Sequence, residues 1–301
     1  MPPETSKFGH VRPGRSDAIG TWLTDVFGRQ KVAIGMVHLP ALPGSPLYDE
    51  VGGMTLVRER TLRDLEALQA AGFDGVMFCN ENDRPYLFES GAETVAAMSA
   101  VVGQLRDAIT VPFGIDVLWD PRAALAVAQA TGAAFVREIF TGAYGSDFGF
   151  WNTSPGETLR YRRQIGAGHV RILNNIVAEF AAPVAHRPID VVARGAELIS
   201  LADAICVSGV MTGSAVDGTQ LRVVREVLPK TVLFANTGVN EENVDEILAV
   251  ADGVIVGTSL KVDGITWNPV DEARAKRLMA RVEEARGRRP AAVSARGGSD
   301  A

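Results

Sequence analysis

Cysteine and long apolar runs are both scarce in this chain. Two cysteines occur, Cys79 and Cys206, and both stand inside strand-like apolar runs. This excludes a disulfide-stapled secreted scaffold and indicates buried, reduced thiols in a cytoplasmic protein. No apolar run is long enough to cross a bilayer, so no transmembrane segment is expected. The opening stretch MPPETSKFGHVRPGRSD also lacks the apolar core of a signal peptide.

Basic residues are outnumbered as well. Lys and Arg total 30 against 36 Asp and Glu, which gives a formal net charge of -6 at pH 7. Because no basic stripe is present, a nucleic-acid partner is not expected. No G-x-G-x-x-G follows the first apolar run, and the chain lacks a Walker A sequence, a nucleophile elbow and an H-E-x-x-H motif. These absences weaken a dinucleotide-binding interpretation and leave the other motif-defined chemistries without their signatures.

What the chain does contain is a repeated alternation of apolar and helical segments. The predicted strands cover 31–39, 73–79, 111–117, 133–140, 169–177, 203–209, 232–235 and 253–256. The predicted helices cover 54–71, about 90–108, 120–132, the stretch from 154, 189–201, about 217–228, the stretch after 238 and about 268–286. The strands are near-continuous apolar runs, which is typical of a parallel sheet buried on both faces. Eight consecutive units in 301 residues favour a single-domain α/β (β/α)8 TIM barrel over an open doubly wound sheet.

Local signals mark helix ends and the limits of the barrel. Asp120 and Pro121 start a helix that stops at Gly132, and the segment 154–157 (Ser-Pro-Gly-Glu) is interpreted as a capping box. Both ends of the chain are polar and rich in Gly, Pro, Ser or Arg. We expect a flexible N-terminal extension over 1–20, the barrel over 21–286 and a disordered C-terminal tail over 287–301.

The last two predicted strands run straight into small polar loops. The loop residues that we expect to bind phosphate are Asn236, Thr237, Gly238, Gly257, Thr258 and Ser259. Small residues let backbone N–H groups approach an anion, and the following helix start adds its positive dipole end. Ordinary β/α turns also favour Gly, Asn and Thr. The position of these loops nevertheless favours phosphate, because barrel enzymes commonly hold a phosphate after their last two strands.

Polar residues also stand at the other predicted strand ends, where the chemistry of a barrel belongs. Burying so many of them without partners would be costly, so we expect an open mouth that faces a ligand. The candidates for binding the substrate are Asn80, Glu81, Asp83, Asn175, Ser208 and Thr212. Asn174 and Asn175 point to opposite faces of their strand, and we favour Asn175 for the site.

Four residues are candidates for catalysis: His38, Asp116, Glu138 and Lys261. His38 ends the first strand, and the ordinary histidine pKa of about 6.5 suits acid/base work. The alternative for His38 is a packed, structural histidine. Lys261 follows the last strand as a solvated lysine, a phosphate ligand or, if it is desolvated, a Schiff-base nucleophile.

Asp116 and Glu138 end neighbouring strands and form either a general acid/base pair or two metal ligands. The alternative is a carboxylate paired with Arg137. Because Arg137 and Glu138 point to opposite faces of one strand, we expect only one of them to face the barrel lumen. No spacing demands a metal, so neither a metal site nor a required cofactor is predicted, although Mg²⁺ is compatible with the carboxylates.

Three segments resemble motifs of the BtpA/SgcQ family: GMVHLPALPGSP from 35, ETLRYRR from 157 and GTSLKVDGITWNPVD from 257. The resemblance covers roughly residues 30 to 286 and implies a barrel similar to those that bind ribulose phosphate. One branch of the family is named for photosystem I biogenesis, and another is encoded among sugar-metabolism proteins. Cys79 and Asp116 depart from the family pattern, so we expect a divergent member.

Together these features predict a cytoplasmic enzyme that acts on a phosphorylated sugar or sugar-like metabolite. An isomerase, epimerase or aldolase-type lyase would use Asp116 or His38 to remove a proton next to a carbonyl. Two alternatives stay open: hydrolysis or glycosyl transfer on a nucleoside-like substrate by the carboxylates, and a non-enzymatic assembly factor, as the photosystem branch suggests. The aromatic loop 141–153 is either a lid or a subunit interface, and it favours a homo-oligomer.

Overall fold

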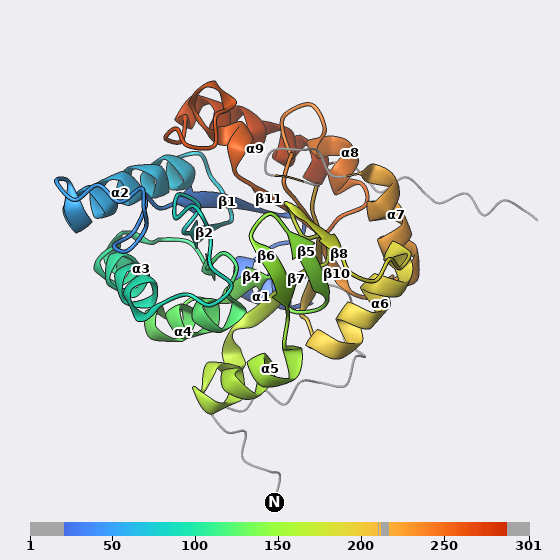
Figure 1. Ribbon diagram of the computed structural model, residues 1–301. Helices are drawn as coiled ribbons and strands as arrows, with labels where there is room; N and C mark the ends of the chain where they lie inside the picture. The colour runs from blue at the N-terminus through green and yellow to red at the C-terminus, as the bar shows by residue number, and fades with distance from the viewer. Residues whose placement is uncertain (1–20, 210, 212–216, 288–301) are drawn as a thin grey trace, which may run out of the picture.

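Parallel strands close into a barrel in the computed structural model, which describes residues 21–209, 211 and 217–287 (Figure 1). The barrel strands are β1 (Val32–His38), β2 (Gly75–Cys79), β3 (Phe113–Asp116), β4 (Phe135–Glu138), β7 (Arg171–Asn175), β9 (Ala204–Val207), β10 (Val232–Asn236) and β11 (Gly253–Val256). Their order around the barrel is β1–β11–β10–β9–β7–β4–β3–β2, so strands that follow each other in the chain are neighbours. Each coincides with a predicted strand, and the predicted (β/α)8 fold is confirmed. The expected extension 1–20, Thr212 and the tail from 288 lie outside the described residues.

The outer ring of helices agrees with the predicted alternation. The helices are α2 (Gly53–Ala70), α3 (Ala92–Gln104), α4 (Pro121–Thr131), α5 (Pro155–Gln164), α6 (Ile189–Ser200), α7 (Gly218–Val227), α8 (Val244–Leu248) and α9 (Glu272–Gly287), with 3-10 turns at Arg106–Ala108, Ala167–His169, Thr258–Leu260 and Val262–Gly264. The Asp120 side chain accepts the amides of Arg122 and Ala123 at the start of α4, and Gly132 ends that helix with a φ of 77°. The capping box predicted at Ser154 is wrong, because that side chain makes no cap hydrogen bond. Within the described ranges, no helix is long and apolar enough to cross a membrane.

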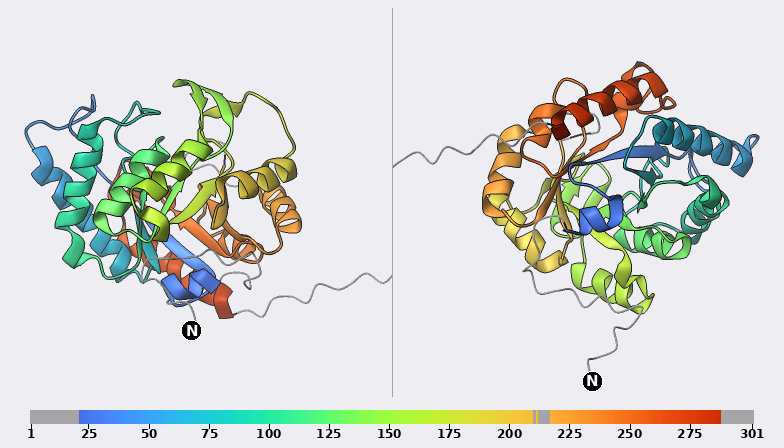
Figure 2. Two further views of the ribbon diagram at one scale, coloured as in Figure 1. Left: turned by 90° about the horizontal axis from the view of Figure 1, so that it is seen from below. Right: turned by 180° about the vertical axis from the view of Figure 1, so that it is seen from behind.

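A helix that the sequence pattern did not predict closes the N-terminal end of the barrel. It is α1 (Thr21–Phe27), which lies beneath the strands (Figure 2) and buries Trp22. Phe27 packs against Phe135 inside the barrel, with ring centroids 5.7 Å apart. Gly114 in β3 makes room for this ring, since a Cβ at Gly114 would lie 2.1 Å from the Phe135 side chain. The lumen is therefore packed at this end, and the opposite end is the one that can admit a ligand.

Three short antiparallel strands form a sheet at the mouth of the barrel, which we call the lid sheet. They are β5 (Ala143–Ser146), β6 (Gly149–Asn152) and β8 (Ala181–Pro183), drawn across the middle of the ring of helices in Figure 1. The aromatic loop 141–153 supplies β5 and β6 as a hairpin in which Tyr144 pairs with Trp151. Trp151 also packs edge-on against Trp119 of the loop after β3, with ring centroids 5.0 Å apart. The loop therefore covers part of the mouth.

A candidate active site at the barrel mouth

An open cavity lies at the carboxyl ends of the barrel strands, with about 760 Å³ of empty space including its mouth. The predicted site residues that line it are His38, Glu81, Asp116, Glu138, Asn175, Asn236, Thr237, Gly238, Gly257 and Thr258. Residues outside the predicted set line it as well: Met36, Met77, Tyr86, Leu118, Trp119, Arg137, Ile139, Glu179, Phe180, Val239 and Ile255. Met36, Met77 and Ile255 belong to the core cluster inside the barrel, so strand alternation could have identified them. The aromatic members come from loops, which carry no such signal.

Several predicted residues in the described part of the chain lie outside the cavity wall: Asn80, Asp83, Ser208, Ser259 and Lys261. Asn80 Oδ1 accepts the amide of Leu118 at 2.8 Å, and Asn80 Nδ2 donates to Asp83 at 3.3 Å. Ser259 donates its hydroxyl to the carbonyl of Val239 at 2.6 Å. Ser208 accepts hydrogen bonds from the side chains of Arg137 and Asn236. Through these hydrogen bonds the residues support the loops and side chains that line the cavity, and they do not line it themselves.

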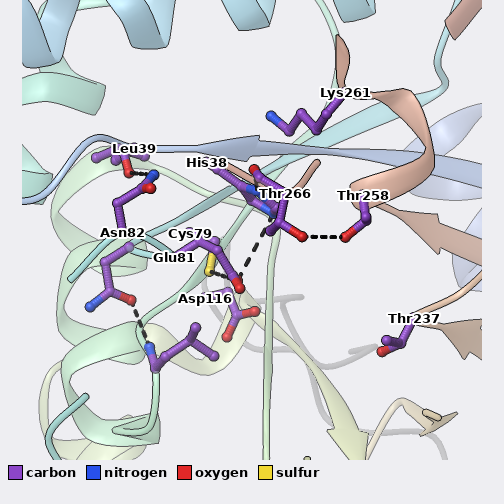
Figure 3. A network of polar contacts seen from close by, with 12 residues as sticks. His38, Leu39, Cys79, Glu81, Asn82, Asp116, Thr237, Thr258, Lys261 and Thr266 are labelled. Carbon is purple, nitrogen blue, oxygen red and sulfur yellow. Dashed lines mark hydrogen bonds and ion pairs between the residues drawn. The ribbon is translucent and has the colours of Figure 1, made fainter. Parts of the chain in front are cut away.

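Lys261 turns away from the cavity. Its side chain is fully buried, and its Nζ lies 2.9 Å from Oδ2 of Asp64 in α2. Figure 3 shows Lys261 on the far side of His38 from Glu81 and Asp116. Burial lowers the pKa of the Lys261 ammonium, and the charge of Asp64 opposes that shift. The geometry therefore favours an ion pair that fixes the loop after β11 to α2, and not the predicted phosphate ligand or Schiff-base nucleophile.

An arginine holds two carboxylates together in the cavity. Arg137 Nη1 lies 3.0 Å from Oδ2 of Asp116, and Nη2 lies 3.4 Å from Oε1 of Glu179. Burial disfavours the charge of Arg137, but the neighbouring carboxylates raise its pKa, so the guanidinium stays a cation. Arg137 and Glu138 both line the cavity, although only Arg137 has the phase that faces the barrel lumen. Arg137 shares the lumen-facing phase of Phe135, whereas Glu138 reaches the mouth because it is the last residue of β4.

Asp116 and Glu138 form a carboxyl pair at neighbouring strand ends, as predicted for their positions. Both side chains are buried, and within the described residues neither Asp116 Oδ1 nor Glu138 Oε1 meets a donor. Burial, the charge of Asp116 and a hydrogen bond with Asp116 raise the pKa of Glu138 well above its usual range. A protonated Glu138 donates a hydrogen bond to Asp116. Arg137 divides its single positive charge between Asp116 and Glu179.

Glu81 and His38 form a second titratable pair (Figure 3). Glu81 Oε2 lies 4.0 Å from His38 Nε2, and His38 Nδ1 lies 3.5 Å from the carbonyl oxygen of Thr266. Burial and then the charges of nearby carboxylates raise the pKa of Glu81 to about 7. Burial and then the charge of Lys261 lower the pKa of His38 well below its usual value, so its imidazole is neutral at pH 7. Glu81, which the sequence suggested only for substrate binding, has the pKa that an acid/base group needs.

The loops after β10 and β11 contribute backbone N–H groups to the wall. Thr237 and Gly238 adopt left-handed backbone, with φ of 68° and 67°. In the part of the chain that the structure describes, no backbone acceptor takes up the N–H of Thr237, Gly238, Gly257 or Thr258. A Cβ on Gly257 would lie 3.3 Å from the His38 ring, so this backbone closely approaches the pair described above. Clustered N–H groups without acceptors can bind an anion.

Metal coordination was left open by the sequence. Among residues 21–209, 211 and 217–287, no group of three or more His, Cys, Asp and Glu side chains is arranged to hold a metal ion. The carboxylates of Asp116 and Glu179 instead contact Arg137. Compatibility with Mg²⁺ stays a prediction.

Two solved structures share this fold. The chain matches (S)-3-O-geranylgeranylglyceryl phosphate synthase from Thermoplasma acidophilum with a TM-score of 0.55 and 14% identity, over 89% of this chain and 99% of that one. It matches phosphoribosyl anthranilate isomerase from Thermus thermophilus with a TM-score of 0.51 and 11% identity, over 84% of this chain and 98% of that one. At such identities the likeness shows the barrel fold alone.

Sequence relatives extend over nearly the whole barrel. A model of the BtpA family matches residues 29–284. The chain is 48% identical to the putative sgc region protein SgcQ of Escherichia coli, over 88% of this chain and 99% of that protein. It is 33% identical to the photosystem I biogenesis protein BtpA of Synechocystis sp., over 87% of this chain and 91% of that protein. The resemblance found in the motifs is confirmed, and the chain belongs to the BtpA family.

Proposed function

We propose that this chain is an enzyme that moves a proton next to a carbonyl group of a phosphorylated sugar or sugar-like metabolite. One observation carries the proposal: backbone N–H groups that meet no acceptor within the described residues share a single cavity with titratable acids. The N–H groups belong to the loops after β10 and β11, and Glu81 follows β2, two places from β11 around the barrel. An enzyme of this class needs both parts, an anchor for the phosphate and a base beside the reacting carbon.

The phosphate anchor consists of the N–H groups of the loops after β10 and β11. The Thr258 hydroxyl, 2.9 Å from that of Thr266, adds a donor at the same wall. One feature opposes an anion here, because the Thr237 hydroxyl donates to a carboxylate oxygen of Glu179 at 2.8 Å. Arg137 contacts that same oxygen at 3.4 Å and offsets its charge. The anchor therefore combines neutral amides with a carboxylate that is already paired.

Glu81 is the base in this proposal. With a pKa of about 7, it can accept a proton at neutral pH and return it. Removing a proton from the carbon beside the carbonyl leaves the electron pair on the carbonyl oxygen, and cationic Arg137 is the donor that stabilises this enolate. Return of the proton to the former carbonyl carbon, with transfer of the neighbouring hydroxyl proton to the former carbonyl oxygen, completes an isomerisation. An epimerisation takes its proton from a second acid on the opposite face, and Glu138, with its raised pKa, is the candidate in this cavity. Asp116, which the sequence suggested as a base beside His38, is less suited because it contacts Arg137 and accepts a hydrogen bond from the Glu138 carboxyl group.

Gly257→Val is expected to abolish the binding of phosphorylated ligands, because the added side chain would occupy the anchor beside the His38 ring. The measurement is thermal unfolding with sugar phosphates and with the same sugars lacking phosphate, each with and without Mg²⁺. A ligand at 100 times its dissociation constant adds about 2.7 kcal/mol of stability. We expect this shift for the unmodified chain with phosphorylated ligands alone. Gly103→Ala in α3 is the control and should keep the shift, since a Cβ there meets nothing within 4 Å.

Other outcomes of the same panel point elsewhere. A shift with free sugars but not with sugar phosphates would contradict the anchor and leave the carboxylates as the binding site. If no small molecule shifts the unfolding temperature and a pull-down retains a membrane complex, an assembly role of the kind named for the Synechocystis relative would be favoured.

A further inference from the structure

The cavity has an aromatic wall that the proposed proton transfer does not use. The wall is formed by Tyr86, Leu118, Trp119, Ile139 and Phe180. These residues come from the loops after β2, β3, β4 and β7. A sugar phosphate is polar throughout, so it would leave this apolar side of the cavity without a matching surface.

Part of the aromatic wall stands across the mouth from the phosphate anchor, whereas Phe180 follows Glu179, which contacts Thr237 of the anchor. In the strand order around the barrel, β3 is four places from β10, and β4 is four places from β11. In a barrel of eight strands these positions are diametrically opposite. Trp119 follows β3, whereas Gly238 follows β10. A ligand whose phosphate occupies the anchor therefore reaches the aromatic wall with its other end, and its middle passes the carboxyl groups of the lumen.

The wall is held in place from behind. Trp119 and Tyr86 have only 4% and 9% of their surface exposed. Trp151 of the lid sheet packs against Trp119, and Phe148 packs against Tyr86 and Trp119 with ring centroids 5.7 and 5.6 Å away. Rings fixed in this way offer a preformed flat surface. A ligand that stacks on them therefore binds with little loss of side-chain entropy.

One polar atom of the wall has no partner. Trp119 Nε1 is buried and meets no acceptor within the described residues. A buried indole N–H usually finds a hydrogen-bond partner, so this donor indicates a group that arrives with the ligand. A ring nitrogen or a carbonyl oxygen on a planar ring would supply the acceptor.

We infer that the substrate of this site carries a planar heteroaromatic ring at the end opposite its phosphate, and that this ring stacks in the aromatic wall. The substrate class is then a sugar phosphate that keeps a carbonyl group and is joined to such a ring. A nucleoside monophosphate shares the ring and the phosphate but has no carbonyl on its sugar, so it serves as a binding probe. The inference rests on the proposed function, because the phosphate anchor determines which end of the ligand reaches the wall.

Isothermal titration calorimetry of the full chain with ribose 5-phosphate and adenosine 5′-monophosphate tests the inference. We expect the nucleotide to bind at least about tenfold more tightly, since stacking of one base on aromatic side chains contributes affinity of that order. Phe180→Leu should reduce this advantage, because Phe180 lines the wall. Trp119→Phe keeps a ring but removes the N–H, and should weaken the nucleotide without weakening ribose 5-phosphate. Phe150→Leu is the matched control, because Phe150 lies in the same lid sheet but is largely exposed and does not line the cavity.

The outcomes separate the ring site from the anchor. Equal affinity for the two probes would overturn the ring site and leave the proposed function standing. A loss of the advantage as large in Phe150→Leu as in Phe180→Leu would also overturn it, because general loosening of the lid sheet would then be the cause. If neither phosphorylated probe binds, the proposed function fails together with the ring site.

Discussion

Asp64→Asn is expected to lower the free energy of unfolding by about 3 to 5 kcal/mol, the usual effect of removing one partner of a buried ion pair. Asp64 joins α2 to the segment after β11: its Oδ2 lies 2.9 Å from Lys261 Nζ, and its Oδ1 accepts the N–H of Val270 at 3.0 Å. Lys261 has no exposed surface, so water cannot replace the lost carboxylate. Urea-induced unfolding followed by circular dichroism measures the change.

The double variant Asp64→Asn/Lys261→Met is expected to recover much of this loss, because it removes the buried charge as well. It should also keep ligand binding, since Lys261 does not line the cavity. Lys276→Met is the matched control: its ion pair with Glu272 is half exposed, and such pairs contribute about 0 to 1 kcal/mol. A loss in Asp64→Asn no larger than in this control would show that the buried pair does not hold the loop.

The unmodified chain is expected to lose about 3 kcal/mol of stability relative to Glu81→Gln as the pH rises through the window set by the pKa of Glu81. That pKa is about 7 in the fold, whereas the ordinary value for glutamate is 4.5. Between these two values the unfolded chain has released the proton that the folded chain still holds. The unfolded state therefore binds fewer protons, and the free energy of unfolding falls as pH rises. Glutamine does not ionise, so the variant lacks this contribution.

Urea unfolding of both proteins from about pH 5 to about pH 8 measures this effect, because subtracting the two profiles removes the groups that they share. The variant should be the more stable protein at the upper end of the range and inactive in the proposed proton transfer. Parallel profiles would contradict the raised pKa of Glu81 and remove the argument for Glu81 as the base.

The barrel was predictable because each of its strands carries its own signal. A strand such as β9 (Ala204–Val207) is buried along its whole length, and this produces the near-continuous apolar run seen in the sequence. The lid sheet was not predictable, because it depends on the pairing of Tyr144 with Pro183 in β8, a contact between separate loops. The sequence did not predict α1 because this helix has only 7 residues, and its buried side chains, Trp22 and Leu23, pack against the lumen of the barrel.

Strand alternation explains why several predicted site residues line the cavity and why another does not. His38, Asp116 and Asn175 have the lumen-facing phase and line the cavity, whereas Asn80 has the other phase and binds the loop after β3. Lys261 could not be placed, since its partner Asp64 lies 197 positions away. The raised pKa of Glu81 and the lowered pKa of His38 were also beyond sequence reasoning, because burial in the fold is the largest cause of both shifts.

The packed interior of the barrel beneath the site also determines how the two thiols react. Cys79 and Cys206 are free and belong to the core inside the barrel, with no exposed surface. Burial raises the pKa of both, that of Cys206 to about 12, so neither forms a thiolate at neutral pH. A disulfide reagent such as Ellman's reagent should therefore modify them only in molecules whose barrel has opened. When modification outpaces reclosing, the rate of colour development equals the rate of opening, which gives the kinetic lifetime of the native barrel without any knowledge of its substrate.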